Sequence, residues 1–438
     1  MTAEIAIINK NAVALAADSA VTLSDPSTSK IYNTANKLFM LSKFEPVGIM
    51  IFGVAEFMSL PLETIIKMYR SHLGSKRFPR LLDYATDFFR FLESNALLFS
   101  ETRQEEALRL LVSKLFWRIR LEIDEQIKAA IAKGPVSDDD ARQIAKAKIN
   151  DYFKNWSNVD FLPSFDSGFE DSLAKDHLQL VEQIANTVFE NFVEVEPIET
   201  YARLAAFRVT RNYWPISTGL VFAGFGELDI LPCVKSFVVE TVVSGKLRKM
   251  ETLNLSNDMN ENSVSSIMPF AQGDIVYRFI QGIDPEYKNE MRKYLNALLT
   301  REYPERLREK FRTLFPGQDE KPYLDEIDEI GARIIGDFDK EWQDLEWKKY
   351  VGPVLAIVDD LPKEDLAAMA ESLVNLTSLK RRISKDAETV GGPIDVAVIS
   401  KGDGFIWIKR KHYFNKDLNP SYFSNYYRMH GEAIPNDN

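Results

Sequence analysis

The chain opens with two short apolar runs that are separated by polar residues. Residues 5–8 are rich in isoleucine, residues 13–17 contain only alanine, valine and leucine, and Asn9-Lys10-Asn11 lie between them. This pattern predicts a hairpin of two mostly buried strands. Because a hairpin brings the end of its second strand beside the start of its first, we expect Asp18 to lie close to the amino terminus.

A long helical region follows the strand-rich opening. Apolar residues recur at helical spacing in residues 81–99, 105–132 and 171–193. Helix breaks are expected at Gly134-Pro135 and Leu162-Pro163, and Ser137 is placed to cap the helix that follows the first break. These segments predict a helical part of the protein between two strand-rich parts.

Strands are expected again in residues 216–250, with a turn at Ser244-Gly245. Residues 284–347 then form a charge-rich helical segment, whose charges we interpret as a solvated helix face. A helix over residues 361–384 and a closing hairpin, with strands at 394–399 and 405–408, complete the pattern. The order of these elements predicts an α+β fold.

The composition is that of a globular protein. The chain has 438 residues, of which 45% are hydrophobic, enough for a sizeable core and a second domain. Its one cysteine, Cys233, excludes an intrachain disulfide and is expected to be buried. The start has no basic segment and no apolar run approaches about 18 residues, so we expect neither a signal peptide nor a membrane span, and a cytoplasmic protein.

Charge and motifs exclude several other classes of function. The formal net charge of -11 argues against general nucleic-acid binding. No cysteine-histidine cluster indicates zinc, and no glycine-rich loop has the order of residues that cradles a phosphate. The four histidines, His72, His177, His412 and His430, give a serine-histidine-aspartate triad no special support. We therefore expect no metal and no cofactor.

Thr2 is the residue that most strongly indicates catalytic chemistry. Removal of Met1, which the small residues at positions 2 and 3 permit, would place a hydroxyl and a free α-amine on Thr2. An α-amine with a pKa of about 7.7 to 8.0 is a suitable base for activating that hydroxyl. Taken alone, Thr2 is better explained as an ordinary second residue on a first strand, so its neighbours decide.

Asp18 and Lys37 provide that context. Lys37, in Asn36-Lys37-Leu38, is expected to reach the same point as Asp18, where its charge would favour a neutral amine and Asp18 would hold it in place. Singly, Asp18 reads as a turn residue and Lys37 as a solvated strand end. Their order behind Thr2 favours the catalytic reading.

At this point the sequence resembles the proteasome-like branch of the N-terminal nucleophile (Ntn) hydrolases. Similar segments open proteasome β-subunits and the peptidase subunit of the bacterial ATP-dependent two-component protease. The matching segments are residues 2–18, Lys37 in Asn-Lys-Leu, residues 49–56, 219–227 and 269–273, and 386–400. They follow the order that the family has them, and the resemblance extends over about half of the chain, in three separated blocks.

The resemblance implies a role for individual residues. Thr2 would be the nucleophile and, through its amine, the base, with Asp18 and Lys37 as the charged pair. The backbone N–H near Gly53 would stabilise the oxyanion. Asp386 and Thr389 match the late residues that support the amine, if one residue is inserted before Gly391-Gly392.

The resemblance also places the substrate and shows where this chain departs from the family. Thr22 would lie on the strand that pairs with an extended substrate, and Ala20 and Val21 are candidates for its pocket. Gln272 stands where the family has a serine flanked by glycines, and Phe52-Gly53 replaces two glycines. Since the loop between Asp18 and Lys37 is a few residues longer than the family's, Lys30 is a rival for the lysine role.

The fold implied is a four-layer αββα sandwich of two antiparallel sheets, with a large helical insertion. The implied segments are core at 1–74, 214–300 and 353–410, the helical insertion at 75–213, a helical extension at 301–352, and a tail at 411–438. The function implied is a threonine-dependent hydrolase, a threonine protease or amidase, that cleaves peptide or other amide bonds through an acyl-enzyme on Thr2. The resemblance further implies self-association into rings or dimers.

Two alternatives remain open. One is a catalytically silent scaffold with the same fold, whose helical insertion recruits a partner. The other is an amidase for a small molecule, which would use the same nucleophile.

Overall fold

A computed structural model describes residues 3–25, 28–32, 35–212, 218–260, 265–317, 321–383, 391–412 and 414–421. It is a mixed helix and sheet protein with antiparallel sheets, which confirms the α+β class. The chain forms two compact units. The first comprises Met1–Leu38, Glu261–Ile399 and Phe405–Asn438, and the second Phe39–Asn260 and Ser400–Gly404.

A five-stranded antiparallel sheet forms the centre of the first unit. Its strand order is β13-β1-β2-β14-β15. The strands are β1 (Glu4–Ile8), β2 (Ala12–Ala17), β13 (Ser266–Pro269), β14 (Asp395–Ser400) and β15 (Gly404–Lys409). The hairpins predicted at the start and near the end of the chain are therefore confirmed. In the first hairpin Ile7 lies opposite Ala14.

Asn9 fixes the turn of the first hairpin. Its side-chain Oδ1 accepts hydrogen bonds from the N–H groups of Asn11 and Ala12, at 3.0 and 3.1 Å. Its Nδ2 donates to the carbonyl oxygens of Val358 and Leu361, each at 3.0 Å. A buried asparagine at this place therefore both closes the turn and ties it to a distant segment.

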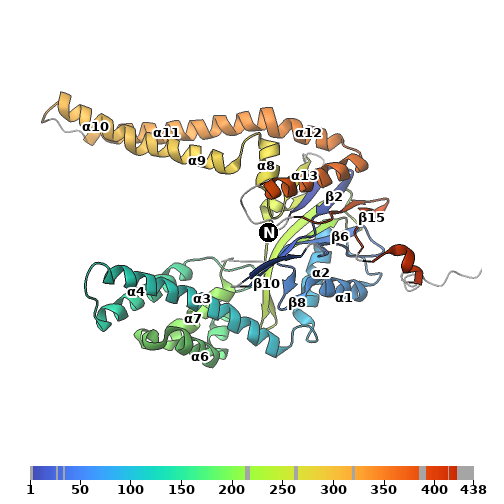
Figure 1. Cartoon of the computed structure of the whole chain (residues 1–438), viewed down its shortest axis with the longest axis horizontal. Coiled ribbons are helices and arrows are strands. Elements are labelled where there is room, and N and C mark those ends of the chain that lie inside the picture. Colours follow the sequence, from blue (N-terminus) through green and yellow to red (C-terminus); the bar gives the residue numbers. More distant parts are fainter. Residues whose placement is uncertain are drawn as a thin grey trace, which may run out of the picture. The chain divides into compact units, whose positions relative to one another are not determined.

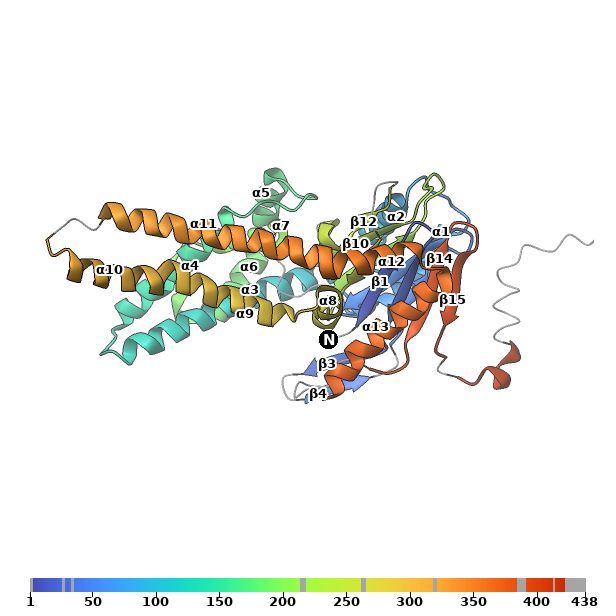
Figure 2. The same cartoon turned by 90° about the horizontal axis from the view of Figure 1, so that it is seen from above.

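Helices cover the first sheet. Helix α13 (Lys363–Ile383) runs along it, as Figure 2 shows. The apolar residues Leu366 and Val374 of α13 share one core with Ile5 and Ile7 of β1. Helix α8 (Asp274–Gln281) and helix α12 (Gly352–Asp360) contribute Val276 and Val358 to that core. The helix predicted over residues 361–384 is thus confirmed.

A long helical hairpin extends from the same unit (Figures 1 and 2). One arm consists of α9 (Pro285–Ala297), a π-helical turn (Leu298–Glu302) and α10 (Tyr303–Leu314). The other consists of α11 (Lys321–Glu346) and a second π-helical turn (Trp347–Val351). Lys288 pairs with Glu346 at 2.8 Å and Arg292 with Asp339 at 2.5 Å. The charges of this segment thus include ion pairs between the two arms.

A six-stranded sheet organises the second unit. The order is β11-β10-β9-β6-β5, and β12 also pairs with β10. The strands are β5 (Leu38–Met40), β6 (Val47–Gly53), β9 (Thr218–Gly224), β10 (Cys233–Val243), β11 (Lys246–Glu251) and β12 (Asn257–Asp258). Ser244 and Gly245 have φ angles of 48° and 73° between β10 and β11, which confirms the predicted turn.

Two helices cover one face of the second sheet, α1 (Leu62–Leu73) and α2 (Leu81–Ser94). The rings of Phe88 and Phe89 on α2 meet Phe222 edge to face, with centroids 5.7 and 5.8 Å apart. Two short two-stranded sheets complete the strands described, β3 (Val21–Asp25) with β4 (Thr28–Tyr32), and β7 (Glu56–Phe57) with β8 (Leu60–Pro61).

The predicted helical region forms a lobe with its own core. Its helices are α3 (Glu101–Ile131), α4 (Asp138–Ser157), α5 (Ser167–Asp176), α6 (Leu178–Phe189) and α7 (Ile198–Thr210). Ser137 caps α4 as predicted, because its Oγ accepts from the Asp140 N–H at 3.2 Å. The helical pattern over residues 171–193 is not continuous: α5 ends and α6 begins at His177. In the part of the chain described, no helix is both long and apolar enough to cross a lipid bilayer.

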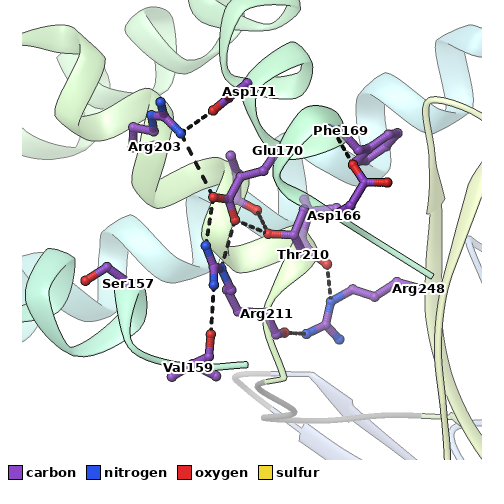
Figure 3. Close-up of polar contacts among 12 residues, drawn as sticks. Ser157, Val159, Asp166, Phe169, Glu170, Asp171, Arg203, Thr210, Arg211 and Arg248 are labelled. Carbon is purple, nitrogen blue, oxygen red and sulfur yellow. Dashed lines mark hydrogen bonds and ion pairs between the residues drawn. The ribbon is translucent and has the colours of Figure 1, made fainter. Parts of the chain in front are cut away.

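A buried carboxylate holds this lobe together (Figure 3). Glu170 of α5 is 3% exposed and accepts two hydrogen bonds from the Arg211 guanidinium, both at 2.8 Å. The hydroxyl of Thr210 donates to the same carboxylate at 2.6 Å. Arg248 of β11 donates to the carbonyl oxygens of Val209 and Arg211, at 3.0 and 2.8 Å. These bonds join α5, the end of α7 and the second sheet in a satisfied polar network.

Candidate functional site

The first hairpin places Asp18 directly after β2, the central strand of the first sheet. Its N–H donates to the carbonyl oxygen of Ala3 at 3.0 Å, which continues the pairing of β1 with β2. Its side chain is fully buried. Oδ1 accepts from the N–H of Ala3 at 3.2 Å, and Oδ2 accepts from the N–H of Gly391 at 2.9 Å. The carboxylate therefore fixes the backbone immediately after residue 2.

Lys37 meets the same carboxylate. Its side chain is 2% exposed, and its Nζ donates to Oδ1 of Asp18. The Nζ also lies 3.0 Å from Oε1 of Glu4. Charge-assisted hydrogen bonds of this kind are stronger than those between neutral groups. A buried ammonium group is thus fixed at the open end of the first hairpin. It lies beside Glu4, the second residue that the structure describes.

Glu4 is the residue of this cluster that the sequence analysis missed. It is 2% exposed and lies on β1, within an otherwise apolar run. In the register of the hairpin it stands opposite Ala17, the neighbour of Asp18. An acidic residue in a buried strand was the available signal, because a buried carboxylate requires a polar or charged partner.

The three side chains form a charge cluster of Glu4, Asp18 and Lys37. It contains two carboxylates and one ammonium, all buried. Removing one partner of a buried ion pair typically costs about 3 to 5 kcal/mol, because the other charge is left without compensation. The cluster therefore requires Lys37 for stability, and a further cation would bring its formal charge to zero.

Backbone contacts around Ser19 join three segments at this cluster. The N–H of Ser19 donates to the carbonyl oxygen of Gly391 at 3.2 Å, and its hydroxyl donates to that of Pro393. The N–H of Ala35 donates to the carbonyl oxygen of Ser19 at 3.1 Å. Residues 18–19, 35–37 and 391–393 are therefore held together, although they are far apart in sequence.

Other expected site residues lie outside the described residues or are described only in part. Thr2, Asp386 and Thr389 lie outside them. Ala20 is fully buried. Val21 and Thr22 belong to β3, where Thr22 stands opposite Ile31 in β4.

The structure also places the remaining candidates. Lys30, the rival for the lysine role, stands opposite Leu23 in the β3–β4 pair. Gln272 is 6% exposed, and its Oε1 accepts from Nε of Arg381 at 2.6 Å. Gly53 belongs to the second unit, where it ends β6 opposite Thr218 with a φ angle of 76°. That left-handed conformation favours glycine.

No known protein family matches the sequence, and no curated protein matches it either. Among the residues that the structure describes, no group of three or more histidine, cysteine, aspartate or glutamate side chains is arranged to hold a metal ion. The chemistry proposed below is therefore argued from the charge cluster and from the amino-terminal sequence.

Proposed function

We propose that the protein is an N-terminal threonine hydrolase that cleaves peptide or other amide bonds. The observation that carries the proposal is the charge cluster, in which Asp18 binds both Lys37 Nζ and the N–H of Ala3. Thr2 is bonded covalently to Ala3, so its Cα lies about 3.8 Å from that of Ala3. Removal of Met1 would then free an α-amine beside a hydroxyl on the residue that precedes Ala3.

The reaction follows from these groups. The neutral α-amine of Thr2 accepts the hydroxyl proton while the oxygen attacks the carbonyl carbon of the amide. The tetrahedral intermediate collapses to an ester on Thr2, and the leaving amine takes the proton. Water, activated by the same α-amine, hydrolyses the ester and restores the threonine. Each step conserves charge without a cofactor.

Lys37 and its carboxylates would tune this chemistry. A fixed ammonium close to Thr2 favours the neutral form of the amine and stabilises negative charge that develops on the hydroxyl oxygen. Asp18 and Glu4 position that ammonium.

The finer fold that we propose is the four-layer αββα sandwich. Each sheet has helices on one face, α13 on the first and α1 and α2 on the second. The other face of the first sheet is also apolar, with Ala6, Ile8, Val13 and Leu15 fully buried. Strands that are apolar on both sides favour a sheet covered on both faces.

Intact mass and covalent labelling test the proposal. We expect the purified chain to lack Met1 and to gain the mass of one β-lactone inhibitor, attached to Thr2. Thr2→Ser should keep labelling, because serine retains a hydroxyl beside the amine, whereas Thr2→Ala should abolish it. Retention of Met1 in all molecules, or equal labelling of Thr2→Ala, would contradict the hydrolase and favour the silent scaffold.

A further inference from the structure

The second unit contains a cavity of about 700 Å³, which helices α3 and α7 and three strands line. Leu111 and Leu115 of α3 are 5% and 4% exposed, and Val239 of β10 is fully buried. Two further apolar residues of the lining, Val54 and Leu110, are exposed, 43% and 57%. Apolar surface therefore continues from buried to exposed positions, and the volume is within the range of small-molecule sites.

Met58 lines the cavity from an uncommon backbone conformation. Met58 and Ser59, which also lines the cavity, have φ angles of 49° and 62° in the two-residue turn between β7 and β8. Turns of this kind favour asparagine and glycine, so a methionine costs backbone energy here. Its Sδ accepts a hydrogen bond from the N–H of Val242 at 3.3 Å, which ties the side chain to β10. The turn thus keeps an apolar and adaptable side chain in the wall of the cavity.

The charged residues of the lining balance one another. Arg208 is 3% exposed and binds the carboxylate of Glu240, another lining residue, through both terminal nitrogens. Arg118 pairs with Glu122, which follows it on α3, at 3.5 Å. The other charged residues of the lining are two cations and two anions, all exposed: Arg103, Lys114, Glu56 and Glu106. The lining therefore offers no excess of either sign to select an ion.

We infer that this cavity is a binding site for an uncharged molecule with an apolar body, either a hydrocarbon chain or a ring system. The apolar body packs against Leu111, Leu115 and Val239. A charged head group would lose its hydration on entry, and the loss would not be offset, because Arg208 and Glu240 already bind each other. The site does not depend on the chemistry of Thr2.

Fluorescence of N-phenyl-1-naphthylamine, an uncharged probe, tests the site in the full chain carrying Thr2→Ala, so that hydrolysis has no part in the result. We expect saturable binding to a single site and displacement by decanol. Decanoate and decyltrimethylammonium, used below their micelle concentrations, should each compete at least about tenfold more weakly, a difference of about 1.4 kcal/mol. If either ion competes as well as decanol, the ligand class is wrong. Absence of saturable binding would overturn the site itself.

Matched variants on α3 locate the bound probe. Leu110 and Leu121 are both exposed leucines of this helix, 57% and 59%, but only Leu110 is among the lining residues. Leu110→Gln should weaken probe binding about fivefold through lost apolar contact, and Leu121→Gln should leave it unchanged. If both variants bind alike while retaining the native circular dichroism, the probe binds elsewhere and the inference is wrong.

Methionine oxidation locates the ligand without a substitution at the site. Decanol at saturating concentration should slow the conversion of Met58 to its sulfoxide by hydrogen peroxide several-fold, because the ligand covers the thioether. Met250 of β11 is also partly buried but does not line the cavity, so its oxidation should be unchanged. Peptide mass spectrometry measures both rates. An unchanged rate at Met58 would contradict occupation of the cavity.

Discussion

The Nζ of Lys37 lies 3.0 Å from Oε1 of Glu4, on the strand that begins two residues after Thr2. The same ammonium contacts Asp18, which follows the neighbouring strand. Two adjacent strands of one hairpin thus offer a carboxylate each to one buried cation. The position of the lysine is fixed by the register of that hairpin, because Glu4 stands opposite Ala17.

Replacement of Lys37 should affect both stability and hydrolysis. In Lys37→Met, two buried carboxylates lose their shared cation, so we expect the free energy of unfolding to fall by about 3 to 5 kcal/mol. Chemical denaturation measures the loss. Lys30→Met is the matched control for the rival lysine, and it should change neither stability nor labelling of Thr2. The reverse ranking of the two variants would assign the catalytic role to Lys30.

Glu4→Gln should shift the pH dependence of hydrolysis. The variant removes one negative charge near the amino terminus and keeps the shape of the side chain. A nearby negative charge favours the protonated amine, so its loss should move the acidic limb of the pH–rate profile down by roughly 0.5 to 1 pH unit. The profile of kcat/KM on a fluorogenic peptide measures this. An unchanged profile, with only a loss of stability, would give Glu4 a purely structural role.

Gly53→Ala should destabilise the protein through the backbone. The φ angle of Gly53 is 76°, and a side chain there costs about 1 to 2 kcal/mol. Gly245, with a φ angle of 73° in the β10–β11 turn, should show a similar loss when it is replaced by alanine. Chemical denaturation measures both variants, and an unchanged free energy of unfolding would contradict this cost.

Cys233, the one cysteine of the chain, should be unreactive in the native protein. Burial, and then the nearby carboxylates of Asp229 and Asp258, raise the pKa of its thiol from 9.0 to about 12. At pH 8 the thiolate population should be roughly a thousandfold below that of the unfolded chain, and Ellman's reagent should react correspondingly slowly. Because the unfolded thiol loses its proton first, the free energy of unfolding should decrease as pH rises from about 9 to 12. Rapid native labelling at pH 8 would contradict this.

Arg211→Lys should destabilise the helical lobe. Lysine keeps the charge but cannot make the two parallel bonds to Glu170, so we expect a loss of about 1 to 3 kcal/mol by thermal or chemical unfolding. Arg203 reaches Glu170 only at 4.0 Å and pairs mainly with Asp171, with both side chains of that pair about half exposed, 43% and 50%. Arg203→Lys should therefore cost less than about 1 kcal/mol. Similar losses for the two variants would show that the Glu170 network is not central to the lobe.

The local patterns of the sequence predicted much of the fold. The first hairpin, the cap at Ser137 and the turn at Ser244-Gly245 depend on residues close together in the chain, so their signals are local. The break at His177 was missed, because apolar spacing continues across it without glycine or proline. The partner of Asp18 at Gly391 could not be predicted from spacing, since 373 positions separate the two residues.

The candidate site, too, was predicted only in part from the sequence. Asp18 was expected near the amino terminus because of the hairpin, Lys37 was expected to reach the same point, and the structure brings their side chains together. Glu4 was passed over because it reads as a strand residue among isoleucines. A cavity that helix α3 lines could not be predicted, because its lining comes from two helices, three strands and the loops beside β7, whose juxtaposition depends on tertiary packing.

The hydrogen bond between Asp18 and Gly391 also has a consequence for folding during synthesis. During synthesis at about 5 to 20 residues per second, the 373 positions between them take roughly 20 to 75 s to be made. The first strand therefore leaves the ribosome long before its last partner exists. A truncated chain lacks this closing contact, so in an unfinished polypeptide the Asp18 carboxylate is without one of its hydrogen-bond donors.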